Sequence, residues 1–185
     1  MSFKGYGVEI RPVAPRDLIY LRNSRNSSEI RNQMVDTSYI TSAKQRLWYE
    51  NIIKNDDIAY WIVLQRGNRV GSMNIRLKPS KKHKKIIDVG MYVWGRKANH
   101  GLIGISVALV QLDLVFYFLH LNSLETAPKK HNKRAIAFNK KLGYTKINED
   151  SIFVYIKIDK NRYEQNKRKF ERYFKKCNFL EVIDN

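Results

Sequence analysis

Hydrophobic and polar positions at the start of the 185-residue chain predict one short strand followed by helices. Residues 8–13 alternate apolar Val and Ile with Glu, Arg and Pro, which is typical of a strand that ends before a helix start. Residues 17–25 and 28–34 carry apolar side chains at helical spacing and predict a helical pair. Thr41 is placed to cap a third helix that includes Leu47, Trp48, Ile52 and Ile53.

The next region predicts antiparallel strands. Residues 59–64 and 70–77 are rich in β-branched and aromatic side chains, and the Arg-Gly-Asn-Arg sequence at 66–69 between them is a hairpin signal. Residues 78–85 contain Pro and many Lys, which predicts a loop. A further strand is expected over residues 86–94.

From there the order changes to strand, helix, strand, helix. A long apolar helix is expected to start at Leu102, a short strand at 124–128, and a second helix to end at Gly143, which is suited to a C-terminal cap. Such an order predicts local parallel pairing between the strand at 86–94 and the strand at 124–128.

The remainder predicts strands at 144–148 and 151–159 and a charged helix at 160–176. With 43% hydrophobic residues, the length suits one domain. We therefore expect an α/β (α+β) fold with a central, mostly antiparallel sheet flanked by helices. Residues 1–159 would form the domain, and the basic helix and tail of residues 160–185 would pack on it.

Charge widens the choice of partners. The chain has 35 Lys and Arg against 17 Asp and Glu, a net charge of +18. A positive surface attracts phosphate-bearing molecules, so coenzyme A, nucleotide sugars, ribosomes and nucleic acid all qualify. Solvated lysines with no partner would produce the same composition, and both interpretations stay open.

Cysteine and hydropathy patterns favour the cytoplasm. Cys177 is the only cysteine, which excludes a disulfide framework. The apolar run at 102–121 contains Gln111 and Asp113, and an Asp at a bilayer centre costs about 3 kcal/mol. We expect a helix buried against the sheet, with these residues marking its polar side, and no membrane partner. The histidines lack metal-ligand spacing, so no metal is expected.

Two motifs carry a family resemblance. Residues 99–104, Asn-His-Gly-Leu-Ile-Gly, stand between the strand and the apolar helix, and Asn132-Lys133-Arg134-Ala135-Ile136 is followed by Leu142-Gly143-Tyr144. In this order they resemble the acyl-CoA-binding core of the GNAT N-acetyltransferase superfamily, with its Q/R-x-x-G-x-G/A, N-x-x-A-I/V and L/C-G-F/Y patterns. The chain departs from the first pattern: with Gly104 as the last glycine, Leu102 replaces the first. The alternative register matches Gly101 and leaves Ile103 unmatched.

The resemblance implies acetyl-CoA as co-substrate. Its pyrophosphate would lie on backbone N–H groups at a helix N-terminus, which carry the positive end of the helix dipole. Backbone N–H groups of the preceding strand would hold the thioester and pantetheine. The implied coenzyme contacts are Tyr92, Val93, Trp94, Asn99, His100, Gly101, Leu102, Ile103, Gly104, Asn132, Ala135 and Phe138.

Candidate catalytic groups follow from the same resemblance. Asp88 occupies a strand position where relatives often carry a Glu base, although it could instead pair with a lysine nearby in the sequence. Relatives often place a Tyr acid seven residues after the helix Asn, and here that residue is Asn139. Tyr144 is our candidate acid, with Tyr155, His100 or an unassisted thiolate as alternatives, since a thiol has a pKa near 8.5.

The N-terminal third suggests the acceptor. Leu21-Arg22-Asn23, Ser28-Glu29-Ile30-Arg31 and the following helix resemble acetyltransferases that act on amino-sugar nucleotides, although Leu21 stands where Trp is usual. Arg22, Asn23 and Arg31 are the expected substrate contacts. Arg25 could join the other arginines in holding a diphosphate, and ordinary surface arginines are equally compatible.

Two alternatives remain from sequence. The chain could acetylate protein N-termini, as ribosomal-protein acetyltransferases of this family do, and its positive charge would suit docking on rRNA. It could also be a non-catalytic nucleic-acid-binding module of the same fold. Either a monomer or a homodimer is compatible with the sequence.

Overall fold

The computed structural model describes residues 1–78, 86–95, 102–174 and 180–183, and two antiparallel sheets organise them. The larger sheet has the order β5-β4-β3-β2-β1-β9. Its strands are β1 (Ser2–Gly5), β2 (Val8–Pro12), β3 (Ile58–Gln65), β4 (Asn68–Lys78), β5 (Ile86–Val93) and β9 (Glu181–Ile183). The smaller sheet has the order β6-β8-β7 and contains β6 (Ser123–Thr126), β7 (Thr145–Glu149) and β8 (Val154–Asp159).

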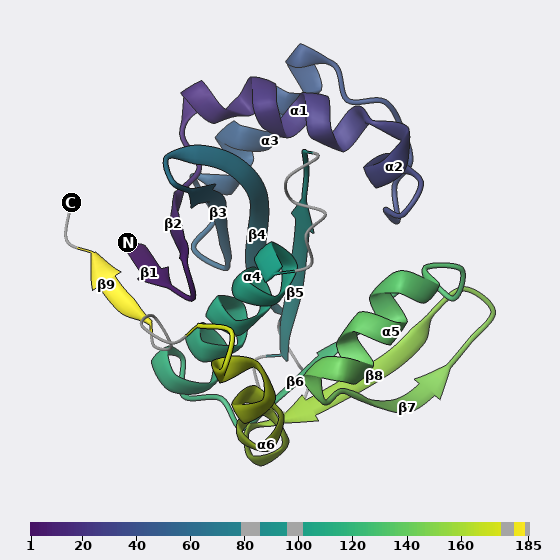
Figure 1. The fold of residues 1–185 in the computed structure, drawn as a ribbon. Coiled ribbons are helices and arrows are strands. Elements are labelled where there is room, and N and C mark those ends of the chain that lie inside the picture. The colour runs from purple at the N-terminus through teal and green to yellow at the C-terminus, as the bar shows by residue number, and fades with distance from the viewer. Residues whose placement is uncertain (79–85, 96–101, 175–179, 184–185) are drawn as a thin grey trace.

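Helices cover both faces of the larger sheet (Figure 1). They are η1 (Pro15–Asp17), α1 (Leu18–Asn26), α2 (Ser28–Arg31), α3 (Ser42–Ile52), α4 (Leu102–Asp113), the π-helical turn η3 (Leu114–Phe118), α5 (Lys133–Leu142) and α6 (Lys160–Glu171). Helices α1 and α3 lie on one side of the sheet and α4 on the other, while α5 lies with the smaller sheet. The predicted α/β fold is confirmed.

Alternating side chains on β4 and β5 explain the two layers. Met73 and Met91 belong to the core that α4 completes. Tyr92, which points to the other face because successive strand residues alternate, packs with Leu21 of α1 and Trp48 of α3. Each face of the sheet therefore has its own apolar layer. We call the side covered by α1 and α3 the α1/α3 face.

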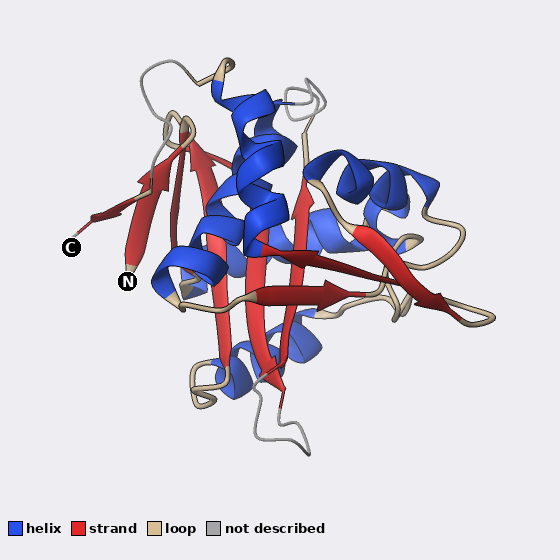
Figure 2. Ribbon diagram, turned by 90° about the horizontal axis from the view of Figure 1, so that it is seen from below, coloured by secondary structure: helices blue, strands red, loops and turns tan. Residues whose placement is uncertain are grey.

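The predicted parallel pairing is wrong. Strand β6 pairs antiparallel with β8, at Leu124 opposite Ile158, and no described strand pairs with the outer edge of β5. Figure 2 shows the strands of the smaller sheet running across the direction of β4 and β5. Strand β6 has only four residues, and its backbone hydrogen bonds are made with β8. Strands β5 and β6 therefore belong to separate sheets.

Both chain ends add strands that the sequence pattern did not predict. Strand β1 forms a hairpin with β2 through Tyr6 and Gly7, whose φ angles of 51° and 77° suit a tight two-residue turn. Strand β9 pairs with β1 at the sheet edge. Only four and three residues long, these strands have too few alternating positions to be recognised.

The polar residues of the apolar helix are buried, so the predicted polar side of α4 is wrong. Gln111 donates to the Asn74 and Gly90 carbonyls at 3.1 and 3.0 Å. Asp113 accepts hydrogen bonds from Tyr6 and, at 2.7 Å, from Tyr163 of α6. Within the described ranges, no helix has the length and apolarity needed to cross a bilayer.

Candidate functional site

The outer edge of β5 supplies backbone groups beside α5. The Trp94 N–H donates to the Val70 carbonyl at 2.9 Å and is therefore used within the sheet. Because N–H directions alternate along a strand, those of Met91 and Val93 face the open edge. These two amides fit the expected contacts with the thioester and pantetheine better than the Trp94 amide does. A coenzyme contact by Trp94 or Tyr92 stays a prediction and would use other atoms.

The start of α4 lies beside α5. Asn99, His100 and Gly101 fall outside the described residues. Leu102 is exposed, whereas Ile103 is buried in the core. A Cβ on Gly104 would lie 3.9 Å from the Phe138 ring, so Gly104 and Phe138 are brought together between the two helices.

Helix α5 is capped at both ends as its sequence predicts. The Asn132 Oδ1 accepts from the Ala135 N–H at 3.0 Å, and Gly143 ends the helix with φ of 109°. Capping uses the Asn132 oxygen and leaves its NH2 group as the donor that could reach a coenzyme. That this amide, the β5 edge and the start of α4 together bind an acyl-coenzyme A arm stays a prediction.

The candidate base lies on the α1/α3 face. Asp88 is partly buried and lies opposite Arg76 in the β4–β5 register. Two residues later, a Cβ on Gly90 would approach the Asn74 Oδ1 to 2.6 Å, so only glycine fits there without moving Asn74. A catalytic role for Asp88 stays a prediction.

The candidate acid is enclosed. Tyr144 is 7% exposed, and burial raises the pKa of its hydroxyl. The phenol therefore stays protonated, as a proton donor requires, but it lies within the core. Asn139, at the usual Tyr position, is partly buried on α5. The acid role of Tyr144 stays a prediction.

The N-terminal arginines have different surroundings. Arg22 donates to the Ser42 hydroxyl at 2.5 Å, Asn23 is exposed, and Arg31 is partly buried. Arg25 donates through Nη2 to the Asp36 carbonyl, and its Nη1 is buried without a partner among the described residues. The three arginines are all partly buried, and of them Arg25 is the one with a buried nitrogen that has no partner among the described residues.

Half-buried aromatic rings lie on the α1/α3 face of the sheet. Trp48 of α3 meets Tyr60 of β3 edge to face at 4.9 Å, and Tyr92 lies 5.7 Å from Trp94. All four rings are only partly covered. Burial raises the pKa of Tyr92. The α1/α3 face thus combines a carboxylate, aromatic rings and guanidinium groups.

A clasp joins the two halves of the molecule near Asn132. Lys129 donates to the Met34 and Val35 carbonyls, the latter at 3.4 Å, and His131 Nε2 lies 3.3 Å from the Asn32 carbonyl. We call these contacts the 129–131 clasp. Since Asn132 follows directly, the clasp connects the segment after α2 to the start of α5.

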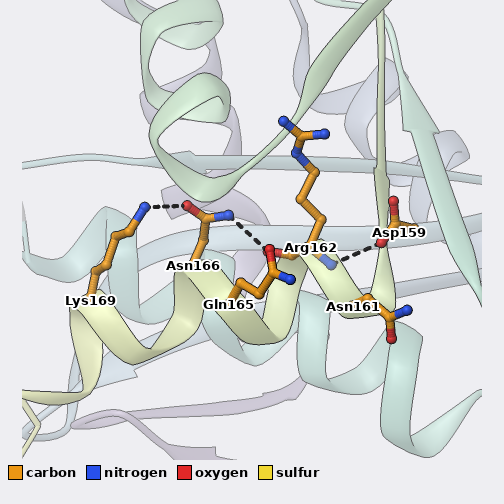
Figure 3. Close-up of a pocket in the computed structure, with 6 residues that line it drawn as sticks. All are labelled: Asp159, Asn161, Arg162, Gln165, Asn166 and Lys169. Atoms are coloured by element: carbon orange, nitrogen blue, oxygen red, sulfur yellow. Dashed lines mark hydrogen bonds between the residues drawn. The ribbon is translucent and has the colours of Figure 1, made fainter.

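Two cavities lie away from these residues. One of about 510 Å³ runs along α6 and is lined by Asp159, Asn161, Arg162, Gln165, Asn166 and Lys169 (Figure 3). Its polar groups bond one another, with Lys169 donating to the Asn166 Oδ1 at 2.8 Å. A second, of about 330 Å³, lies between α6, η3 and β9. Among the described residues, no group of three or more His, Cys, Asp or Glu side chains could hold a metal ion.

Comparisons with known proteins agree with this geometry. The acetyltransferase (GNAT) domain family matches residues 8–145. The fold resembles apo FdhC, a nucleotide-linked sugar GNAT, with 22% identity, a TM-score of 0.73 and coverage of 94% of this chain and 98% of that one. A comparison with curated protein sequences finds no match.

Two further solved structures share the fold. Aminoglycoside acetyltransferase AAC(6')-Ib in complex with coenzyme A is 16% identical, with a TM-score of 0.73 over 85% of this chain and 98% of that one. Spermidine N-acetyltransferase from Vibrio cholerae, in complex with coenzyme A and spermine, is 17% identical, with a TM-score of 0.70 over 85% and 98%. Since the family match spans most of the chain, this protein belongs to the GNAT family and is an acetyl-CoA-dependent N-acetyltransferase.

Proposed function

We propose that this enzyme acetylates the primary amine of an amino-sugar nucleotide. The observation that carries the proposal is the α1/α3 face, where Trp48, Tyr60 and Tyr92 lie between the arginines of α1 and the Asp88 side of β5. Partly exposed aromatic rings offer a stacking surface for a sugar or base. Guanidinium groups recognise phosphate oxygens. The similarity to a nucleotide-linked sugar GNAT supports the same acceptor class.

Asp88 would prepare the amine for attack. A neutral amine is the nucleophile, so Asp88 accepts its proton directly or through water. The N–H groups of Met91 and Val93 would stabilise the oxyanion that develops on the thioester carbonyl. Acetyl-CoA supplies the activated acetyl group. The new C–N bond replaces the C–S bond, and the proton balance closes when the departing thiolate is protonated.

The 129–131 clasp favours a small acceptor. It ties the acceptor-side helices to the coenzyme-side helix α5, whereas an acceptor peptide on a folded protein needs an open approach. A ribosomal-protein or nucleic-acid partner has only the net charge of +18 in its favour.

The test is a thiol-release assay over an acceptor panel. It contains nucleotide-linked amino sugars, the same amino sugars without nucleotide, kanamycin, spermidine and an N-terminal peptide. We expect kcat/KM to be about 100-fold higher for a nucleotide-linked sugar than for the free sugar, because polar sites discriminate strongly against acceptors lacking the recognised group. Preference for spermidine, kanamycin or the peptide would contradict the proposal.

A further inference from the structure

Arg25 of α1 carries a buried donor whose partner is missing. Its Nη2 is held by the Asp36 carbonyl, but its Nη1 meets no acceptor among the described residues. Buried charged donors are normally paired, because leaving one unsatisfied forfeits its hydration. The side chain nevertheless stays charged, since arginine is not deprotonated in proteins.

Two other arginines near α1 are paired with acid, whereas the Nε of Arg76 on β4 is, like the Arg25 Nη1, buried without a partner among the described residues. Arg11 donates twice to the Asp17 carboxylate at 2.6 and 2.9 Å, and Arg69 donates to the same carboxylate at 2.7 Å. Arg25 has no carboxylate in that role. Burial lowers the pKa of Arg25, with Tyr92, Asp36 and Tyr60 as its neighbouring titratable groups. A site that desolvates one guanidinium nitrogen and gives it no acceptor suits an anion brought by a ligand.

The surroundings of Arg25 are held in place. Asn26 exchanges two hydrogen bonds of 2.8 Å with the backbone of Ile40, which fixes the segment between α2 and α3 on α1. The hydroxyl of Ser24, the residue before Arg25, donates to the Tyr20 and Leu21 carbonyls at 2.8 and 3.0 Å within α1. Residues 35–39 of the segment are exposed, and the Asp36 carbonyl among them accepts from the Arg25 guanidinium.

Arg25 also lies at a useful place along β5. Asp88 and Tyr92 point to the same face and are four residues apart, about 13 Å along a strand. Tyr92 marks the Arg25 end. That distance is longer than one sugar ring, so an acceptor could reach from a base at Asp88 to an anion site at Arg25 over the aromatic rings of this face.

We propose that Arg25 is the anion-binding residue of the acceptor site, with Nη1 donating to a phosphate oxygen of a nucleoside diphosphate group. This inference rests on the proposed function and selects one arginine from the group that the sequence suggested. The ligand would displace part of the exposed segment at 35–39 to reach Nη1.

The first experiment measures UDP binding by calorimetry with coenzyme A saturating, so that the coenzyme's own diphosphate site is filled. The variants are Arg25→Met, which removes the donors, and Arg25→Lys, which keeps the charge. Arg46→Met is the matched control, because Arg46 is an exposed arginine on α3. We expect the wild type and the control to bind alike and Arg25→Met to lose affinity about 10-fold or more, with Arg25→Lys in between. Equal UDP affinity in wild type and Arg25→Met, or no UDP binding by the wild type, overturns the inference.

Kinetics separate this inference from the proposed function. For Arg25→Met and Arg25→Lys, kcat/KM should fall more for a nucleotide-linked amino sugar than for the free amino sugar. An equal loss on both acceptors overturns the anion role and leaves the function standing. If the wild type acetylates no nucleotide-linked sugar but still binds UDP through Arg25, the function fails and the anion site stands. Binding of coenzyme A by each variant confirms that it is folded.

Discussion

The Tyr163 hydroxyl of α6 donates a 2.7 Å hydrogen bond to the carboxylate of Asp113, which is buried at the end of α4. Tyr6 of the β1–β2 turn and Lys167 of α6, at 3.0 Å, bind the same carboxylate. Three parts of the chain far apart in sequence are therefore joined at one buried charge, and α6 is anchored to the core.

The Tyr163→Phe change should lower the free energy of unfolding by about 2 kcal/mol, because it removes a buried hydrogen bond to a charged group. Asp113→Ala should cost more, about 3–5 kcal/mol, since it leaves the Lys167 ammonium without its carboxylate. Urea unfolding measures both. Tyr173→Phe is the control, because Tyr173 is 50% exposed and should stay close to wild type. A loss for Tyr163→Phe no larger than the control's would contradict the anchoring role.

Asn132 offers a way to separate structure from coenzyme binding. Its Oδ1 caps α5, and serine can also cap a helix but lacks the amide NH2 group. We expect Asn132→Ser to keep wild-type stability and bind acetyl-CoA more weakly. Asn132→Ala should lose both the affinity and about 1 kcal/mol of stability. The measurements are urea unfolding and the shift in melting temperature with acetyl-CoA.

If Asn132→Ser binds acetyl-CoA as tightly as wild type, Asn132 caps α5 but its NH2 group does not contribute to coenzyme binding. The serine variant decides this point because the alanine variant changes stability and donor together.

The sequence predicted those structural features that depend on a few adjacent residues. The Asn132 cap, the Gly143 C-cap and the Arg66-Gly67 turn depend on a few adjacent residues, and all three are present in the structure. The pairing of the strand at 124–128 depends on which of two distant strands, β5 or β8, it lies against. It pairs with β8, and the residues of β6 themselves do not indicate which strand is the partner.

The site residues also differ in whether neighbouring residues in the sequence or distant parts of the fold determine their role. Motif matching identified Gly104 and Phe138, and these two residues lie together in the fold. The arginines of α1 look alike in sequence, and only burial and hydrogen bonding distinguish Arg25 from Arg22. Gln111 and Asp113 were expected at the helix surface, because sequence does not reveal that carbonyls and hydroxyls from other elements would satisfy them in the core.

Lys129 should control the approach to the acceptor side. Lys129→Met removes the donors that hold the Met34 and Val35 carbonyls and should destabilise the fold by about 1 kcal/mol. Amide hydrogen exchange over residues 32–40 should become faster, because the clasp no longer holds that segment. Lys130→Met is the matched control, since the Lys130 ammonium forms an exposed ion pair of 3.6 Å with Glu149 and takes no part in the clasp. Equal exchange in the two variants would show that the clasp does not restrain the segment.

Asp17 predicts the acid limit of stability. Burial alone would raise the pKa of this carboxyl, but hydrogen bonds from Arg11, Arg69 and the Ala14 N–H outweigh burial and lower the pKa from 3.8 to about 2. A carboxyl with a lowered pKa in the folded state binds its proton less readily than in the unfolded chain. Its stabilisation is therefore complete above about pH 4 and is lost as the pH falls toward 2.

The measurement is the urea midpoint as a function of pH for the wild type and for Asp17→Asn, which cannot ionise. The wild type should lose stability steeply between pH 4 and 2, and the variant should be less stable at pH 7 and show a shallower decline over that interval. Asp56→Asn is a control, because Asp56 is exposed before β3 and should leave the profile unchanged. Parallel profiles for wild type and Asp17→Asn would mean that the two arginines do not hold the carboxylate in its charged form. In that case the join between β2, β4 and η1 would depend on packing alone.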